Sequence, residues 1–145
     1  MKVALHIRRL RLADYDAMIR LFRVCGLNPR TKGRETRAAI AAQFRTTRNR
    51  YLGAFEGSRL IGTVLGTHDG RKGWINRLAV HPEYRRRHVA SRLVRLCERG
   101  LRDQGIQIFA ALIEPDNSAS EAVFRALGYE IHPMHYARRK IHADI

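Results

Sequence analysis

GWINRLAVHPEYRRRHVASRLVRLCERGLRDQG, residues 73–105, is the stretch that decides the fold, because a strand pattern runs through an arginine-rich turn into a long helix pattern. Strict alternation predicts a strand ended by Pro82, with Trp74, Asn76, Leu78 and Val80 on one face and Ile75, Arg77 and Ala79 on the other. The next apolar residues follow a helical spacing that ends at Gly105, and they are Val89, Leu93, Leu96, Cys97 and Leu101.

The turn between this strand and this helix carries Arg85, Arg86 and Arg87. The first N–H groups of a helix have no acceptor within the helix, so here they point into a positive field. This combination predicts an anion site, with phosphate as the expected ligand. The alternative is a solvated basic turn that binds nothing.

The length and composition of the chain indicate a single basic domain. The chain has 145 residues and a formal net charge of +15, which favours an anionic partner: a phosphorylated cofactor, nucleic acid, the ribosome or an acidic protein. The arginines are spread over nearly every segment instead of a disordered tail, so we expect nucleic acid to be an unlikely partner. A generally basic proteome would produce the same excess.

The two cysteines, Cys25 and Cys97, lie far apart, and each falls on the apolar stripe of an expected helix. They are interpreted as reduced core residues. The sequence contains no CxxC or HExxH spacing, so we expect no metal. It shows neither a signal peptide nor an apolar run of membrane-spanning length, so we expect a cytoplasmic protein without membrane association.

The N-terminal half predicts a strand over 5–10, a helix that Asp14 caps and Gly26 ends, and a basic loop over 28–33. A less amphipathic helix is expected over 35–46. The ranges 51–55, 60–67 and 73–80 then form a meander of three antiparallel strands.

The C-terminal half predicts a buried strand over 106–113, parallel to the strand that begins at Gly73. The spacing Ser118–Glu121 is that of a capping box and would leave Asn117 just outside the last helix with a free side chain. The ranges 129–132 and 135–139 are expected to form a closing hairpin.

This order of elements resembles the GNAT superfamily of acyl-CoA-dependent N-acyltransferases, and two motifs carry the resemblance. One is LAV-x-P-x-(Y/H)-(Q/R)-x-x-G-x-(G/A), matched by Leu78, Ala79, Val80, Pro82, Tyr84, Arg85 and Ala90. The other is N-x-x-(A/S)-x-x-(L/V)-(Y/F)-x-x-x-G-(F/Y), matched by Asn117, Ser120, Val123, Phe124, Gly128 and Tyr129. The resemblance implies a single α+β domain over 1–145, with a mixed, mostly antiparallel sheet, a splayed parallel strand pair and flanking helices.

The resemblance also implies a site for acetyl-CoA between the splayed strands. The backbone of Leu78, Ala79 and Val80 would pair with the pantetheine arm like an added strand. Amides of the loop would hold the pyrophosphate, and they belong to Arg85, Arg86, Arg87, His88, Val89, Ala90 and Ser91. Asn117 would reach the pantetheine or merely cap the last helix, and Phe124 would lie near the thioester.

Three positions depart from the family pattern. His88 replaces a common glycine, and its side chain would either crowd the phosphate or donate to it. Phe124 stands where many relatives have a tyrosine that protonates the departing thiolate, and it cannot donate a proton. Leu112 stands where some relatives have a catalytic glutamate, so Glu114, two residues on, is the candidate base or else an exposed charge. Asn76 is a second catalytic candidate, and His68, Asp69 and Arg77 are candidate substrate contacts.

The sequence therefore predicts an N-acetyltransferase that moves an acetyl group from acetyl-CoA to a primary amine by direct attack in a ternary complex. One alternative is a weak acyl-CoA-binding or sensing domain, and another is a basic nucleic-acid or ribosome-binding module. The acceptor would be a small molecule or a peptide or protein amine, and the basic loop over 28–33 makes an anionic acceptor a reasonable hypothesis. A monomer or a homodimer is expected, with the C-terminal strands around His135 offering the edge for a dimer.

Overall fold

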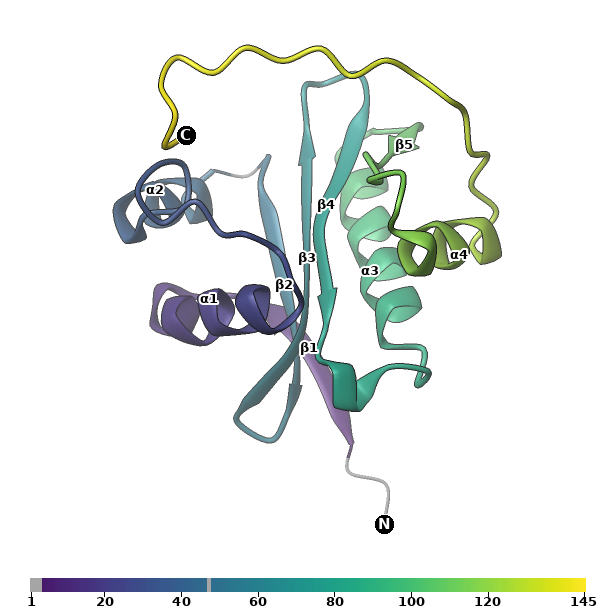
Figure 1. The fold of residues 1–145 in the computed structure, drawn as a ribbon. Coiled ribbons are helices and arrows are strands. Elements are labelled where there is room, and N and C mark those ends of the chain that lie inside the picture. Colours follow the sequence, from purple (N-terminus) through teal and green to yellow (C-terminus); the bar gives the residue numbers. More distant parts are fainter. Residues whose placement is uncertain (1–3, 47) are drawn as a thin grey trace.

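The computed structural model describes residues 4–46 and 48–145 and contains a five-stranded sheet between two layers of helices (Figure 1). The strands follow the order β1-β2-β3-β4-β5, and all neighbours are antiparallel except the parallel pair β4 and β5. Their bounds are Leu5–Arg9, Arg50–Glu56, Arg59–His68, Gly73–Val80 and Phe109–Ala110. The predicted mixed, mostly antiparallel sheet is confirmed.

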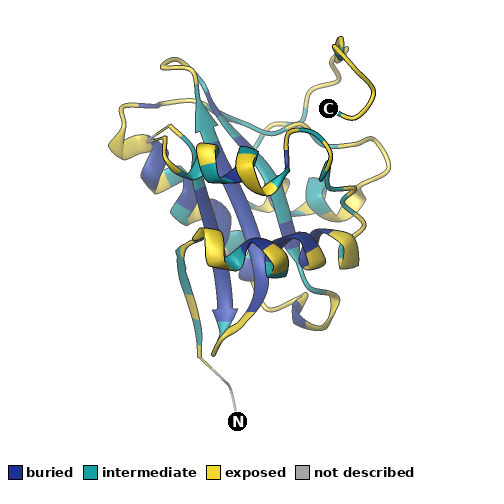
Figure 2. Ribbon diagram, turned by 90° about the vertical axis from the view of Figure 1, so that its left-hand side faces the viewer, coloured by how far each residue is buried: buried dark blue, intermediate teal, exposed yellow. Residues whose placement is uncertain are grey.

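Helices α1 (Tyr15–Val24) and α2 (Arg37–Phe44) cover one face of the sheet, and α3 (Val89–Asp103) and α4 (Ser118–Ala126) cover the other (Figure 1). Two single turns, η1 (Leu12–Asp14) and η2 (Pro82–Tyr84), join strands to helices. Each face has its own core, with Phe22 and Ile40 buried in the first and Leu93 and Cys97 in the second. The buried middle strands lie between them (Figure 2).

A β-bulge interrupts β4 and changes the predicted faces of the strand. Thr63 stands opposite Ala79, but Leu65 stands opposite Asn76, so β4 has one extra residue at Arg77, whose φ is +51°. Ile75 therefore belongs to the α3 core and Ala79 to the α1 core, although unbroken alternation would place both on one face. Leu78 and Val80 pack beside the α3 core.

The predicted strand over 106–113 is shorter than expected. Only Gly73 with Phe109 and Trp74 with Ala110 are paired between β4 and β5. From Ile75 to Val80 the free edge of β4 has no strand partner among the described residues. The two parallel strands thus separate after these two paired positions. Beyond them, the described part of the chain has no hydrogen bonds between β4 and the following segment that would extend β5.

The predicted closing hairpin is wrong. Between 127 and 145 the structure contains no strand, and the segment crosses one end of the fold from α4 toward α2 (Figure 1). Most of its side chains are exposed, including Met134 and Tyr136, so burial does not fix a strand register there. The expected dimer edge around His135 loses its basis.

The helix starts also differ from expectation. Asp14 makes no cap hydrogen bond and instead binds the Arg8 guanidinium at 2.8 Å. Asn117 is not free, because its side chain accepts from the Ser120 N–H at 3.1 Å and caps α4. Thr36 caps α2 and leaves Glu35 outside that helix. The cap of α4 is thus the second of the two roles expected for Asn117, and the Arg8 partner of Asp14 is the contact that the capping pattern does not place.

Candidate active site

The turn from β4 to α3 presents a row of free backbone N–H groups. Among the described residues, the amides from Arg86 to Ser91 have no hydrogen-bond acceptor, and the first helical pairing of this segment is Arg92 N–H to the His88 carbonyl at 3.1 Å. The side chains of Arg85, Arg86 and Arg87 are exposed around them. Free amides at a helix start within a positive field can hold a phosphate group.

Two residues of the turn adopt the left-handed backbone conformation. Arg86 has φ +62°, and His88, the N-cap of α3, has φ +60° and ψ +21°. These angles explain why glycine suits the position of His88. The His88 side chain is exposed and caps no helix amide, so the imidazole leaves the N–H groups uncovered.

Replacing His88 by glycine is expected to raise the free energy of unfolding by roughly 0.5–1 kcal/mol, because the left-handed cost of about 1–2 kcal/mol disappears while glycine adds unfolded-state entropy. Urea unfolding measures this difference. His88→Ala, which keeps the backbone cost, is the matched control and should show no gain. A less stable glycine variant would mean that the imidazole makes a stabilising contact.

The carbonyl of Val80 lies on the free edge of β4. His81 N–H donates to the Ile61 carbonyl, and Val80 stands opposite Gly62, which directs the N–H and C=O of Val80 away from β3. That carbonyl accepts from Arg85 Nε at 3.3 Å and from Cys25 Sγ at 3.4 Å. One arginine of the turn is therefore bound to the strand, and sequence reasoning missed this contact.

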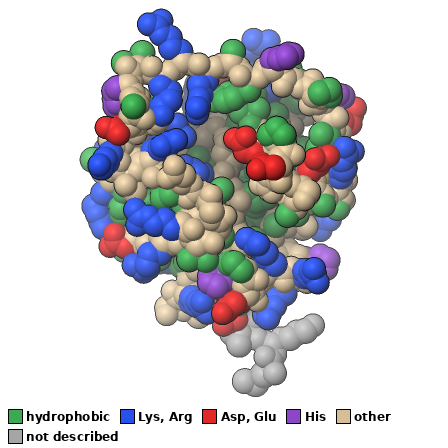
Figure 3. All heavy atoms as spheres, viewed as in Figure 1, with side chains coloured by type: hydrophobic (Ala, Val, Ile, Leu, Met, Phe, Trp, Pro, Cys, Tyr) green, Lys and Arg blue, Asp and Glu red, His purple; other side chains and the backbone are tan. Residues whose placement is uncertain are grey.

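A hollow lies near the centre of the face drawn in Figure 3, with basic side chains on one side and acidic side chains on the other. Two acidic residues, Glu114 and Asp116, are exposed on the segment between β5 and α4. Asn76 is half-buried on β4, immediately before the bulge. The two candidate catalytic residues thus come from β4 and from the segment that follows β5.

Phe124 and the nearby tyrosines pack in the interior. Phe124 is 3% exposed and meets the Tyr129 ring edge-on at 4.9 Å. Burial raises the pKa of Tyr129 above its usual range. The Tyr84 hydroxyl donates to Glu56 at 2.7 Å, and this bond raises the Tyr84 pKa. Neither tyrosine has a hydroxyl prepared to replace the acid that Phe124 lacks.

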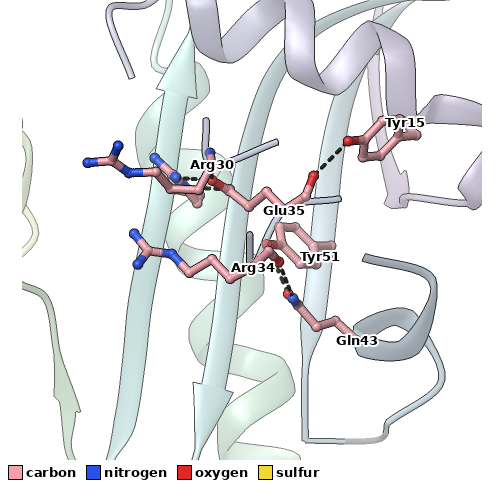
Figure 4. A network of polar contacts seen from close by, with 7 residues as sticks. Tyr15, Arg30, Arg34, Glu35, Gln43 and Tyr51 are labelled. Carbon is pink, nitrogen blue, oxygen red and sulfur yellow. Dashed lines mark hydrogen bonds and ion pairs between the residues drawn. The ribbon is translucent and has the colours of Figure 1, made fainter. Parts of the chain in front are cut away.

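A buried ion pair ties the loop before α2 to the bulge of β4. Glu35 is 3% exposed, and its carboxylate accepts from Arg77 Nε at 2.8 Å, from Arg77 Nη2 and from the Arg30 N–H at 2.8 Å. Tyr15 donates to the Glu35 carbonyl at 2.6 Å (Figure 4). Thr63 Oγ1 donates to the Arg77 carbonyl at 3.0 Å. Arg77 is therefore a structural residue of the bulge and not a free substrate contact.

The other candidate contacts are also held by the turn that contains them. Asp69 accepts from the N–H groups of Arg71 and Lys72 at 2.9 Å, and His68 accepts from the Gly70 N–H at 3.0 Å. They shape the β3–β4 connection.

Both cysteines are unsuited to covalent catalysis. Burial raises the pKa of the Cys97 thiol to about 12 and raises that of Cys25 as well. A thiol that keeps its proton at neutral pH is a poor nucleophile.

Within residues 4–46 and 48–145, no three His, Cys, Asp or Glu side chains are grouped to hold a metal ion. Over the same residues, no helix has the length and apolar character needed to cross a bilayer.

Comparison with known proteins identifies the family. Residues 15–129 match the family model described as Acetyltransferase (GNAT) family. Acetyltransferase plu1384 of Photorhabdus laumondii is 30% identical over 127 residues, covering 87% of each chain. Acetyltransferase ECA0875 of Pectobacterium atrosepticum is 28% identical over 126 residues, covering 87% of this chain and 88% of that protein.

Two solved structures share the fold at low sequence identity. The PaiA N-acetyltransferase of Thermoplasma acidophilum, in complex with coenzyme A, superposes with a TM-score of 0.81 at 19% identity, over 91% of this chain and 93% of that one. AAC(6')-Iy, in complex with the bisubstrate analogue CoA-S-monomethyl-acetylneamine, gives 0.78 at 19% identity, over 94% and 99%. With the sequence match over most of its length, the chain belongs to the acetyltransferase (GNAT) family and is an acetyl-CoA-dependent acyltransferase.

Proposed function

We propose that this protein transfers an acetyl group from acetyl-CoA to a primary amine of a small molecule, by direct attack of the amine in a ternary complex. The observation that carries the proposal is the row of free amides from Arg86 to Ser91, beside an unpaired edge of β4. This arrangement suits a ligand that has a diphosphate at one end and an extended arm at the other.

In this proposal, the amides from Arg86 to Ser91 bind the diphosphate, since the Arg85 N–H already donates to the Pro82 carbonyl, and the free edge from Leu78 to Val80 pairs with the arm. The exposed guanidinium groups of Arg86 and Arg87 add charge. Asn117 contributes through its capping of α4, which fixes the start of that helix, and the buried Phe124 ring provides an apolar wall.

Direct attack follows from the state of the thiols, since neither cysteine offers a thiolate for an acyl-enzyme. An ammonium must first lose a proton, and Glu114 is the candidate acceptor, with Asn76 across the opening as a polar contact for the amine. A backbone N–H near Leu78 would polarise the carbonyl. Since Phe124 has no proton to give, the departing thiol, with an ordinary pKa of about 8.5, leaves as the thiolate or is protonated by water.

A small-molecule amine is the acceptor best supported. Aminoglycoside acetyltransferases are among the proteins with this fold, and the acidic residues Glu114 and Asp116 are exposed between β5 and α4, where they would attract a cation. An anionic acceptor has less support, because the positive charge of Arg77, the basic candidate contact on β4, is already neutralised by Glu35.

Calorimetry with coenzyme A and a thiol-release assay over aminoglycosides, polyamines and peptide amines test the proposal. Thiol release that depends on a small amine is the expected result. Tight coenzyme A binding without amine-dependent release would instead indicate a sensing domain. Salt-dependent RNA binding that coenzyme A does not reduce would indicate a nucleic-acid module.

Replacing Glu114 by glutamine is expected to lower kcat by roughly 10²-fold or more while KM changes little, because proton transfer contributes on this order and the amide keeps the shape. Asp116→Asn is the matched control, since it removes a neighbouring exposed charge from the same segment. If both variants lower kcat equally and slightly, Glu114 acts only through the electrostatic effect of its negative charge, and another group is the general base.

A further inference from the structure

A second arginine-lined cavity lies on the α3 face, between α3 and the strands β1 and β2. It measures about 230 Å³, and its lining includes Arg9, Arg50, Arg99 and Asp103. Arg99 is ten residues beyond Val89, which is roughly 15 Å along the helix axis at 1.5 Å per residue. The cavity is therefore separate from the free amides at the start of α3.

Arg50 is the central residue of this cavity. It shares a face of β2 with Leu52 and Ala54, which belong to the α3 core. Its Nε is fully buried and has no hydrogen-bond partner among the residues that the structure describes. The Nη groups of the same guanidinium are not buried in this way and carry no hydrogen bond among the described residues, so they can donate to an acceptor that enters the cavity.

Gly100 makes room for this arginine. A Cβ at Gly100 would lie 2.6 Å from Arg50 Cδ and Nε and 2.7 Å from Nη1. Glycine inside a helix costs about 1 kcal/mol relative to alanine, and here it lies where the guanidinium crosses α3. The helix thus carries an unfavourable residue at a position where any side chain would collide with Arg50.

The positive charge of the cavity is not balanced from within. Arg9 reaches only the Asn49 carbonyl, at 3.4 Å, and in the described part of the chain neither Arg50, Arg99 nor Asp103 forms an ion pair. Arg8 also lines the cavity, but its charge is neutralised by Asp14, and its guanidinium lies over the Phe55 ring of the α1 core. Three guanidinium groups thus face a single carboxylate.

The floor of the cavity is apolar and consists of Ile7, Leu52 and Leu96. Guanidinium groups bind phosphate oxygens through paired N–H donors, and three of them converge here. We propose that this cavity is a binding site for a phosphate group, either inorganic phosphate or a small phosphate monoester whose apolar body contacts the floor. The site is independent of the acetyl-CoA site and does not rest on the proposed acyl transfer.

The test is a titration followed by ¹H–¹⁵N NMR, on protein alone and on protein saturated with coenzyme A so that phosphate cannot report the first site. Inorganic phosphate is expected to shift the Arg50 Nε–H and the Gly100 amide with saturation in the millimolar range. Phenyl phosphate should bind about tenfold tighter if the apolar floor takes part. Equal affinity for the two probes would assign the site to inorganic phosphate.

Two variants distinguish specific binding of phosphate in this cavity from non-specific attraction of an anion to a basic protein. Arg50→Met should abolish the saturable shifts. Gly100→Ala keeps every charge but displaces the flexible end of Arg50, and it should weaken binding at least about tenfold in a protein that is folded and equally or more stable. Arg23→Met, an exposed arginine on α1, is the charge-matched control and should change nothing.

Non-saturating shifts spread over many arginines, or a Gly100→Ala variant that binds like the wild type, would overturn the proposal. If coenzyme A does not bind, the phosphate titration can still be interpreted, because the Arg50 and Gly100 signals are also followed in the free protein.

Discussion

Replacing Glu35 by alanine is expected to lower the free energy of unfolding by about 3–5 kcal/mol, because one partner of a buried ion pair is removed and the other stays. The change leaves the Arg77 guanidinium, whose side chain is 18% exposed, without its carboxylate, and it leaves the Arg30 N–H without an acceptor. Urea unfolding monitored by the single tryptophan, Trp74, measures the loss.

The control restores neutrality without restoring the pair. In the double variant Glu35→Gln with Arg77→Met, the amide still accepts from Arg30 and no charge is left buried, so most of the lost stability should return. If the double variant is as unstable as the sum of the two single changes, the pair contributes through something other than its charges. A loss below about 1 kcal/mol for Glu35→Ala would show that water reaches Arg77.

Introducing a carboxylate at the start of α3 is expected to separate ligand affinity from stability. In Ala90→Glu the new charge lies among the free amides where we propose the diphosphate binds. Repulsion of a few kcal/mol at about 4 Å corresponds to roughly a 100-fold weaker affinity for coenzyme A, measured by calorimetry. The free protein should gain about 0.3–1 kcal/mol in stability, because an acidic residue suits a helix N-terminus.

Ala90→Gln adds nearly the same volume without the charge and is expected to weaken binding less than about tenfold. Equal losses in the two variants would attribute the effect to crowding. Unchanged affinity in both would mean that the diphosphate does not bind at this turn.

The sequence predicts the parts of the fold that rest on regular patterns. The arginine-rich turn, the α3 stripe and the three-strand meander are where their periodicities place them. The bulge at Arg77 escapes such reasoning, because no residue type in the strand marks the extra residue, and an unbroken alternation places Ile75 and Ala79 on one face. The prediction of a hairpin over 129–139 fails for a different reason. Most side chains of this segment are exposed, so no burial of its apolar residues stabilises a strand there.

The candidate site divides in the same way. The helix start and its arginines follow from local sequence, and the Asn117 cap joins residues three apart, but the partner of Glu35 is brought close only by folding. Glu35 had one available signal, since it is the only acidic residue in an otherwise basic stretch from Asn28 to Arg45. The sequence does not predict which arginine pairs with Glu35, because Arg77 is distant in sequence.

The contact between Arg85 and the Val80 carbonyl has a consequence for how a ligand arm would dock on β4. That carbonyl is already satisfied in the free protein, so an arriving donor exchanges one hydrogen bond for another and gains little net free energy. The displaced guanidinium, however, would then lie beside the free amides from Arg86 to Ser91, where we propose that the diphosphate binds. Docking of the arm and clamping of the phosphates would then be coupled through one side chain that changes partners.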